Sequence, residues 1–593
     1  MLRRPLALAL ACLIALLAAP AAAHAVWFPA EPLDGPSAAI LGSGGAGVAP
    51  DGGGAVVWRR TDGVFLSRLV AGSFQTPVRI DAGTGAGASE AAVTAGDGGR
   101  LAVVWIAGNR LYGAQAPSAR APAPLSAPVL LFESPTGALD GLDVDIGVNG
   151  TAYAVFRAPG TGGGNVRAVR LLGATWEGLA APLDIDPARP AGVGTGRPRV
   201  AVAADGNAVV AWGEAGAVYG RRLTGLALSL APQPISFPGE GTADAPAVSI
   251  EHDGSFAWVA FRQEVSGTPR AFGRRLIGSL YEPAVLLDAG YAAGAPDVAL
   301  NGRGQGVAAV PTAGGAIGQY VGTDDLFEPP ARLDGGGATE TGVVASDLRE
   351  VAVVWRGPAG DVLARFKRER QPWEAIWGLS RPELGVVAPG SLRLGGDRRS
   401  DVVAAMVQGE GAATRLVAAV YDRPPSPPFL PERTRFQRTS RPRLSWSPGI
   451  ELWGVSYTVA IDGKVVGSTD APRLRVPAPL REGAHKVVIS AVDRRGQATP
   501  GRERVLRVDG TPPRVRVAVT GARRAGAALR IRVRATDRGA GIRSYRIDFG
   551  DGAAVARGAR GTHRYRRGRF TLRAAVTDRA GNTGSARLRL TIR

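Results

Sequence analysis

An internal repeat organises residues 26–422 of the sequence. Its unit is an apolar strand, a turn centred on Asp or Asn, and a second apolar strand. The turn residues are Asp51, Asp97, Asn149, Asp205, Asp253, Asn301, Asp347 and Asp397. They span 346 residues in seven intervals, an average near 49, and a four-stranded propeller blade takes roughly 40 to 50 residues. We therefore expect an all-β fold in which about eight blades form a β-propeller.

The clearest copy of the repeat runs from Val200 to Trp212 and turns at Asp205-Gly206-Asn207. Asp-Gly and Asn-Gly between apolar runs are typical of tight hairpins, because these residues tolerate a positive φ. The second strand is too continuously apolar to be half exposed, so we expect it to be buried on both faces between blades. It ends at a bulky apolar residue in each unit: Trp58, Trp105, Phe156, Trp212, Phe261, Val310, Trp355 and Met406.

Each unit continues with a third strand, such as Val218–Arg222, and a fourth that contains an aromatic residue, such as Trp176–Asp184. The segment Trp27–Asp34 resembles a fourth strand but has no first three before it. The last unit, Leu392–Tyr421, has no fourth strand after it. We expect the N-terminal segment to complete the last blade, which closes the ring and leaves few unpaired strand edges.

The repeat resembles that of secreted bacterial proteins with D-G-N-A-V-A-V-W turns, which occur beside fibronectin type III and PKD-like modules. The resemblance covers about residues 26–422 and implies a propeller fold, but it specifies no activity. The sialidase Asp-box, Ser-x-Asp-x-Gly-x-Thr-Trp, also marks propeller hairpins and has no copy here.

Two smaller modules follow a proline-rich linker at residues 423–430. Residues 431–509 resemble a fibronectin type III or Ig-like β-sandwich, with Trp446 as a core residue. Residues 510–593 resemble a PKD domain. The motifs that carry the second resemblance are Ile547-Asp548-Phe549-Gly550-Asp551-Gly552, His563-Arg564-Tyr565 and Val576-Thr577-Asp578-Arg579-Ala580-Gly581-Asn582.

The net charge of +20 is concentrated at the C-terminal end of the sequence. Residues 1–422 hold 34 basic and 39 acidic residues, residues 423–510 hold 16 and 8, and residues 511–593 hold 21 and 4. Alternation over 529–534 places Leu529, Ile531 and Val533 on the core face and three arginines on the other. This array is either a solvated face in an arginine-biased proteome or an attachment surface for an anionic wall polymer, acidic polysaccharide or extracellular DNA. Few stacking aromatics interleave the arginines, so we expect no specific nucleic-acid recognition.

Residues 1–25 have the pattern of a secretory signal peptide, with Arg3 and Arg4, an apolar core and a small-x-small site at 23–25. A lipobox at Cys12 and a twin-arginine signal are weaker interpretations. Cys12 is the only cysteine, so disulfides cannot stabilise the mature chain. We expect a secreted or cell-envelope protein, monomeric, without a transmembrane segment or cofactor. Its protein partners are not predicted by the sequence.

Motifs for catalysis are sparse. His252, His485 and His563 fall in different domains and are expected to be structural. The pattern Gly42–Gly47 matches G-x-G-x-x-G but is expected to be a connecting loop. Turn formation and a calcium ion both account for one acidic set in the PKD-like module: Asp537, Asp548, Asp551 and Asp578, with Asn582. The propeller loops also carry carboxylates that a glycosidase could use, among them Glu214, Glu264 and Asp324.

These observations favour a non-catalytic extracellular binding or scaffold protein of the bacterial envelope. In this hypothesis the propeller presents ligand-binding loops, and the arginine-rich module aids attachment to an anionic polymer. The alternative is a secreted glycoside hydrolase or lyase that acts on polysaccharide and uses the propeller as its catalytic domain.

Overall fold

The computed structural model describes residues 26–84, 87–117, 124–160, 162–228, 231–322, 327–431 and 436–593. The expected signal peptide lies outside these residues. The described chain divides between two compact units, one ending at Arg423 and one from Pro424 to Arg593. Besides strands and turns, it contains three short 3-10 helices: η1 (Gly194–Gly196), η2 (Pro382–Leu384) and η3 (Gly411–Ala413). The all-β expectation is confirmed, and none of the described helices has the length and hydrophobicity of a membrane span.

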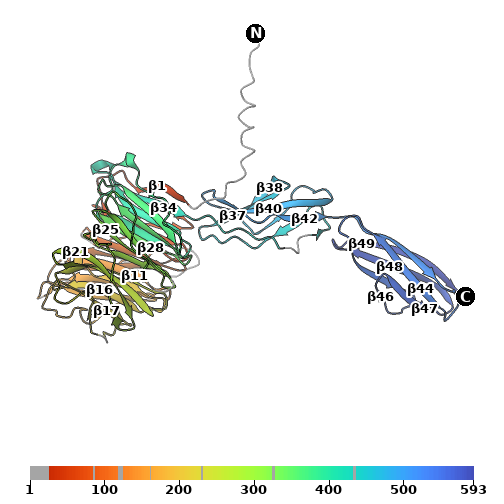
Figure 1. The fold of residues 1–593 in the computed structure, drawn as a ribbon, viewed down its shortest axis with the longest axis horizontal. Coiled ribbons are helices and arrows are strands. Elements are labelled where there is room, and N and C mark those ends of the chain that lie inside the picture. The colour runs from red at the N-terminus through yellow and green to blue at the C-terminus, as the bar shows by residue number, and fades with distance from the viewer. Residues whose placement is uncertain are drawn as a thin grey trace, which may run out of the picture. The chain divides into compact units, whose positions relative to one another are not determined.

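The described part of residues 26–422 forms eight separate antiparallel sheets (Figure 1). Their first strands are β2 (Ile40–Val48), β7 (Glu90–Gly96), β11 (Asp140–Ile146), β15 (Arg199–Val202), β19 (Ala243–Ile250), β24 (Asp297–Leu300), β28 (Glu340–Ala345) and β32 (Arg393–Gly396). Their second strands are β3 (Gly54–Arg60), β8 (Arg100–Ala107), β12 (Ala152–Ala158), β16 (Ala208–Glu214), β20 (Phe256–Val265), β25 (Gly306–Thr312), β29 (Glu350–Arg356) and β33 (Val402–Gln408).

The third and fourth strands complete each sheet. The third strands are β4 (Gly63–Val70), β9 (Arg110–Ala116), β13 (Asn165–Leu172), β17 (Ala217–Leu223), β21 (Thr268–Ile277), β26 (Gly315–Val321), β30 (Val362–Arg368) and β34 (Arg415–Asp422). The fourth positions hold β5 (Ser73–Phe74) with β6 (Val78–Arg79), β10 (Val129–Glu133), β14 (Thr175–Gly178), β18 (Gln233–Pro234), β22 (Leu280–Tyr281) with β23 (Val285–Leu286), β27 (Ala331–Arg332), β31 (Trp377–Gly378) and β1 (Val26–Asp34).

The turn residues of the repeat build the hairpins between first and second strands. The Asp205 carboxylate accepts a hydrogen bond from the backbone N–H of Asn207 at 2.9 Å, and Gly206 has a φ of 87°. Asp253 accepts the same bond from Ser255 at 2.8 Å. This short-range bond stabilises the turn locally. The second strands are buried as expected, with Trp58, Trp105, Trp212 and Trp355 fully enclosed.

The N-terminal strand lies in the sheet of the last repeat. β1 pairs antiparallel with β34, with Trp27 opposite Tyr421 and Val26 opposite Asp422. The Trp27 ring also packs against Phe366 and Tyr421, at centroid distances of 5.9 and 5.6 Å. The strand that is missing from the last repeat is therefore supplied by the segment that precedes the first.

The expectation of a loop at Gly42–Gly47 is wrong, because these residues lie within strand β2. First strands contact one another in chain order from β2 to β32, and β32 also contacts β2. A Cβ at Gly44 would lie 2.7 Å from the Ala91 carbonyl oxygen, and one at Gly47 would lie 2.9 Å from Thr94 Cα. The glycines are therefore required by the close approach of β2 to β7, not by a flexible connection.

The unit from Pro424 to Arg593 contains two sandwiches. The first uses β35 (Phe436–Gln437), β36 (Arg443–Ser445), β37 (Val455–Ile461), β38 (Lys464–Thr469), β39 (Arg473–Arg475), β40 (Gly483–Asp493), β41 (Ala498–Pro500) and β42 (Arg504–Val508). Trp446 is buried in its core, as expected. The second uses β43 (Arg514–Thr520), β44 (Ala528–Thr536), β45 (Ile542–Asp548), β46 (Ala556–Arg557), β47 (Arg560–Arg564), β48 (Gly568–Asp578) and β49 (Thr583–Ile592).

The last module packs two sheets over one core. One sheet has the order β43-β44-β47 and the other has the order β46-β45-β48-β49. Leu529, Ile531 and Val533 of β44 pack with Leu572 and Leu590 of the second sheet. The two remaining faces of the sandwich therefore point away from each other.

Candidate functional site

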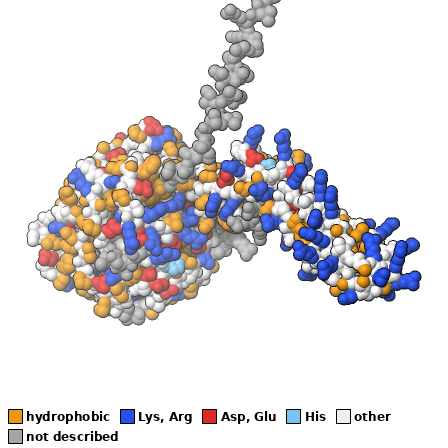
Figure 2. Space-filling view, turned by 45° about the vertical axis from the view of Figure 1, so that its right-hand side comes forward, with side chains coloured by type: hydrophobic (Ala, Val, Ile, Leu, Met, Phe, Trp, Pro, Cys, Tyr) orange, Lys and Arg blue, Asp and Glu red, His pale blue; other side chains and the backbone are white. Residues whose placement is uncertain are grey.

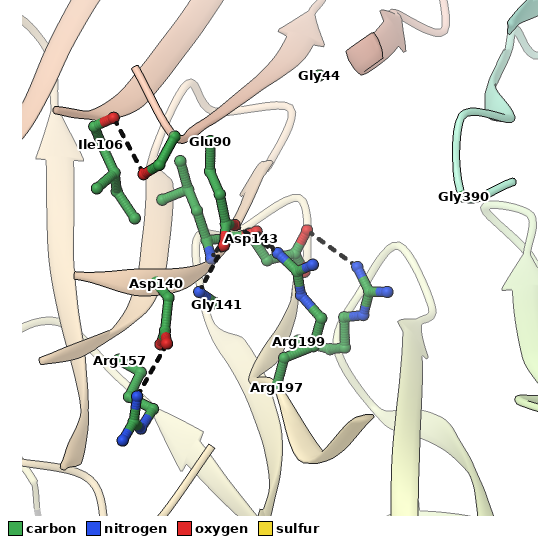
Figure 3. Close-up of polar contacts among 12 residues, drawn as sticks. Gly44, Glu90, Ile106, Asp140, Gly141, Asp143, Arg157, Arg197, Arg199 and Gly390 are labelled. Atoms are coloured by element: carbon green, nitrogen blue, oxygen red, sulfur yellow. Dashed lines mark hydrogen bonds and ion pairs between the residues drawn. The ribbon is translucent and has the colours of Figure 1, made fainter. Parts of the chain in front are cut away.

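Charged side chains gather along the first strands of residues 26–422 (Figure 3). Glu90 of β7, Asp143 of β11 and Arg199 of β15 come from three consecutive sheets. Arg199 Nη1 lies 3.8 Å from Asp143 Oδ1, and Arg197 Nη2 lies 2.7 Å from Glu90 Oε2. Sequence reasoning missed this cluster, although one signal was present: a charged residue near the start of most first strands.

The carboxylates of this cluster bind the backbone of the next sheet. Glu90 accepts hydrogen bonds from the N–H groups of Gly141 and Leu142 at 3.0 and 2.9 Å. Asp143 accepts one from Val200 N–H at 3.0 Å. The same bond recurs from Val343 N–H to Asp297 and from Gly390 N–H to Glu340. Each first strand lies at the edge of its sheet and has no hydrogen-bonded strand on its outer side, so these side chains satisfy N–H groups outside the sheet ladder.

The cluster also joins the last sheet to the first. Arg393 of β32 donates from Nε to the Gly44 carbonyl of β2 at 3.0 Å. Burial lowers the pKa of this guanidinium, and the charge of Glu340 partly offsets that effect. Burial raises the pKa of Asp145 to about 7 and that of Asp297 to about 6. Both carboxylates accept hydrogen bonds from the backbone of the next sheet, so their role is structural.

The two carboxylates considered for glycoside hydrolysis that lie among the described residues, Glu214 and Glu264, have different surroundings. Glu214 is 4% exposed and accepts bonds from Trp212 Nε1, Ile185 N–H and Asp186 N–H, all between 3.0 and 3.1 Å. The Glu214 carboxylate therefore stabilises the loop that contains Ile185 and Asp186. Glu264 is exposed, and Asp324 lies outside the described residues.

Of the acidic residues for which the sequence left turn formation and a calcium ion open, two lie together in the last module and two lie apart from them. Asp537 and Asp578 come together with Asp509, each offering one oxygen within 4.8 Å of the others. Asp551 instead pairs with His563 Nε2 at 2.6 Å, and Asp548 accepts from Gly550 N–H at 2.9 Å. The sequence did not point to Asp509, because it lies in the junction before the module.

The three gathered carboxylates already have backbone partners. Asp509 accepts from Ala540 N–H at 2.6 Å and Asp537 accepts from Gly541 N–H at 2.6 Å. Asp578 accepts from the N–H and side-chain amide of Asn582, both at 2.8 Å. These hydrogen bonds give each of the three carboxylates a structural role, because each one binds the backbone of a nearby turn.

Arginine side chains are dense on the side of the last module that Figure 2 shows. Exposure and strand register place arginines on the outward faces of both of its sheets. The face of β43-β44-β47, which we name face M, carries seven exposed arginines: Arg514, Arg516, Arg530, Arg532, Arg534, Arg560 and Arg564. The face of β46-β45-β48-β49, which we name face N, carries six: Arg546, Arg557, Arg569, Arg573, Arg587 and Arg589. The expected alternation on β44 is confirmed by the burial of its apolar residues.

Many of these arginines face one another directly across strands. Arg516 is opposite Arg534, and Arg532 is opposite Arg560. Arg573 is opposite Arg587 on face N. Like charges in such positions destabilise a sheet. In the part of the chain that the structure describes, no arginine of either face makes an ion pair with a carboxylate.

Arginines of residues 26–422 have different surroundings. Arg262 pairs with Asp244 at 2.6 Å, Arg270 with Asp288 at 2.7 Å, and Arg275 with Glu282 at 2.7 Å. Ion pairs of this kind have no counterpart among the arginines of faces M and N in the described part of the chain.

Comparison with known proteins finds a family match for one part of the chain. Residues 511–592 match the model of the PKD domain. No curated protein matches the chain. A solved structure of the PKD1 domain of the Vibrio cholerae metalloprotease PrtV is 23% identical, covers 14% of this chain and 98% of that chain, and has a TM-score of 0.13.

Two further solved structures are distant from the chain. AofleA from Arthrobotrys oligospora is 11% identical, covers 58% of this chain and 88% of its own, and has a TM-score of 0.33. The GH93 α-L-arabinofuranosidase of Fusarium graminearum, in complex with arabinobiose, is 13% identical, covers 48% and 92%, and has a TM-score of 0.30. The chain thus ends in a module that matches the PKD domain family, at residues 511–592.

Proposed function

We propose that the protein is an exported, non-catalytic binding protein whose last module attaches it to an anionic polymer of the cell envelope or its surroundings. The observation that carries the proposal is the presence of thirteen exposed arginines on faces M and N without carboxylate partners. A polyanion would neutralise the like-charge pairs and release its own counterions.

The larger unit is proposed to be an eight-bladed propeller closed by β1. Three features support this: eight successive sheets, contacts between consecutive first strands that return from β32 to β2, and the pairing of β1 with β34. In this role the unit presents its interstrand loops to a ligand, and its sheets provide a rigid support. The signal-peptide pattern and the PKD match support export of the chain.

Retention of the mature chain on a matrix of immobilised acidic polysaccharide tests the attachment. We expect retention at low salt and elution as the salt concentration rises, because the interaction is electrostatic. A variant with the arginines of faces M and N replaced by glutamine should pass through unretained. Retention of that variant equal to the parent would refute the proposal.

A glycan array combined with a hydrolysis screen separates the binding role from the enzymatic alternative. Binding without release of product is expected. Release of oligosaccharides from any polymer on the array would instead favour a hydrolase or lyase, and would require a catalytic pair beyond Glu214 and Glu264.

A further inference from the structure

We infer that the last module bridges two separate polyanion chains, one on face M and one on face N. This inference rests on the proposed attachment to an anionic polymer and adds the number of chains that one module holds. Its basis is that arginines cover both sides of the sandwich, whereas attachment to a single chain requires one side.

The two faces are opposed and are both suited to an extended chain. The shared core includes Ile531 of β44 and Leu572 of β48, so the arginines of these strands lie on opposite sides of the sandwich. Packed sheets are about 10 Å apart. A chain on face M is therefore separated from a chain on face N by the full thickness of the module.

Each face is a grid of positive charge at a regular spacing. Along β44, Arg530, Arg532 and Arg534 alternate with core residues. Residues two apart on a strand are separated by about 6.8 Å, and neighbouring strands by about 4.8 Å. Both spacings fall within the Debye length of about 8 Å at physiological salt, so a polymer on the face interacts with several guanidinium groups at once.

The preferred ligand is an extended chain of anionic groups and not a base-stacking nucleic acid. The aromatic residues of the module pack in or against the core cluster; they are Tyr545, Phe549, Tyr565 and Phe570. The outward faces therefore offer charge and hydrogen-bond donors without a stacking platform. Arginine is well suited to this role because its planar guanidinium donates two parallel hydrogen bonds to a phosphate or carboxylate.

Light scattering of the mature protein with long-chain inorganic polyphosphate tests bridging. We expect scattering to rise at low salt as chains are cross-linked, and to fall again in excess protein when each chain is saturated. Tripolyphosphate is too short to join two modules and should give no rise. Soluble complexes with the long chain at every ratio, despite binding, would overturn the inference.

Variants of one face separate bridging from attachment. Face M is altered by Arg516→Gln, Arg532→Gln and Arg534→Gln, and face N by Arg573→Gln, Arg587→Gln and Arg589→Gln. Each triple variant should still bind the long chain but lose the scattering signal. If either variant cross-links as the parent does, its altered face is not needed and the inference fails.

Two controls keep the outcomes distinct. A variant with Arg110→Gln, Arg189→Gln and Arg381→Gln loses the same charge from ion-paired positions of the larger unit and should scatter like the parent. A self-associating protein with one active face would still cross-link after the other face is altered, so loss in both triple variants excludes that explanation. Absence of any binding by the parent protein would instead refute the proposed attachment itself.

Discussion

At the scale of single residues, side chains in the larger unit accept hydrogen bonds from the backbone of the neighbouring sheet. Asp145 illustrates this role, since it accepts a hydrogen bond from Val202 N–H at 2.8 Å. Ser249 accepts one from Leu300 N–H at 2.9 Å. Where β2 contacts β7, glycines allow the strands to approach directly. Neighbouring sheets therefore approach one another through polar side chains at some positions and through glycines at others.

Replacing Gly44 by alanine should destabilise the larger unit. Its Cβ would lie 2.7 Å from the Ala91 carbonyl oxygen, which belongs to a backbone that cannot move independently. We expect a loss of about 1 to 3 kcal/mol in the free energy of unfolding, measured by denaturant titration. Gly178→Ala is the matched control, because nothing lies within 4 Å of the added carbon. Equal stability of the two variants would contradict the close approach of β2 and β7.

The pKa of Asp145, raised to about 7 by burial, makes a pH-dependent contribution. Because the folded state binds the proton more tightly than the unfolded state, this carboxyl favours folding at low pH and disfavours it as pH rises from about 4 to 7. Asp145→Asn should remove this loss. Between pH 4 and pH 8, the free energy of unfolding of the variant should rise by about 1 to 3 kcal/mol relative to that of the parent, after allowance for solvent screening.

The comparison of parent and variant cancels the titration of other groups. Thermal unfolding at a series of pH values measures it. A constant difference between the two proteins at all pH values would show that Asp145 titrates in its usual range. Asp143 contributes to the same shift through its like charge, so its own replacement should move the pKa of Asp145 downward.

At the scale of elements, the sheet of the last repeat combines strands from the two ends of the larger unit. β1 covers the edge of β34, and Trp27 fills a core with Phe366 and Tyr421. An uncovered β34 would present unpaired backbone groups to other molecules. The N-terminal segment thus contributes to stability and to solubility.

Deletion of residues 26–35 should lower the melting temperature or make the protein oligomerise. Loss of the buried Trp27 side chain alone should lower the free energy of unfolding by about 3 to 5 kcal/mol. Differential scanning calorimetry and sedimentation velocity measure the two effects. A synthetic peptide of residues 26–35 should restore the parent values by adding a strand to the exposed edge. An unchanged monomer after deletion would contradict the role of β1.

The strand pattern could be predicted from the sequence because it depends on local rules. Asp205 and Gly206 specify a tight turn, and the apolar run before Trp212 specifies a buried strand. The charged cluster around Glu90 and Asp143 and the acidic group at Asp509 could not be predicted in this way. They arise where segments far apart in the sequence meet, and the hydrogen bonds that define them follow from the three-dimensional packing of sheets.

The misassignment of Gly42–Gly47 has a similar cause. Glycine is usually a sign of turns, and only the proximity of Ala91 and Thr94 shows why an extended strand needs it. The arginine alternation of β44 was predictable because a strand places every second residue on one face. Its pairing with β43 and β47, which brings arginines opposite one another, required the sheet register.

At the scale of the whole molecule, charge is divided between the parts of the chain. Residues 1–422 are nearly balanced, with 34 basic and 39 acidic residues, whereas residues 511–593 have 21 and 4. The cationic module should dominate the association of the protein with polyanions and steer its encounter with them.

The salt dependence of polyphosphate binding tests the central claim most directly. If the seven arginines of face M release counterions from one chain, the logarithm of the binding constant should fall with the logarithm of salt concentration with a slope of about −5. This slope should become shallower by about 2 in the face M triple variant, which carries Arg516→Gln, Arg532→Gln and Arg534→Gln. A slope near zero, or one that these substitutions leave unchanged, would contradict the account.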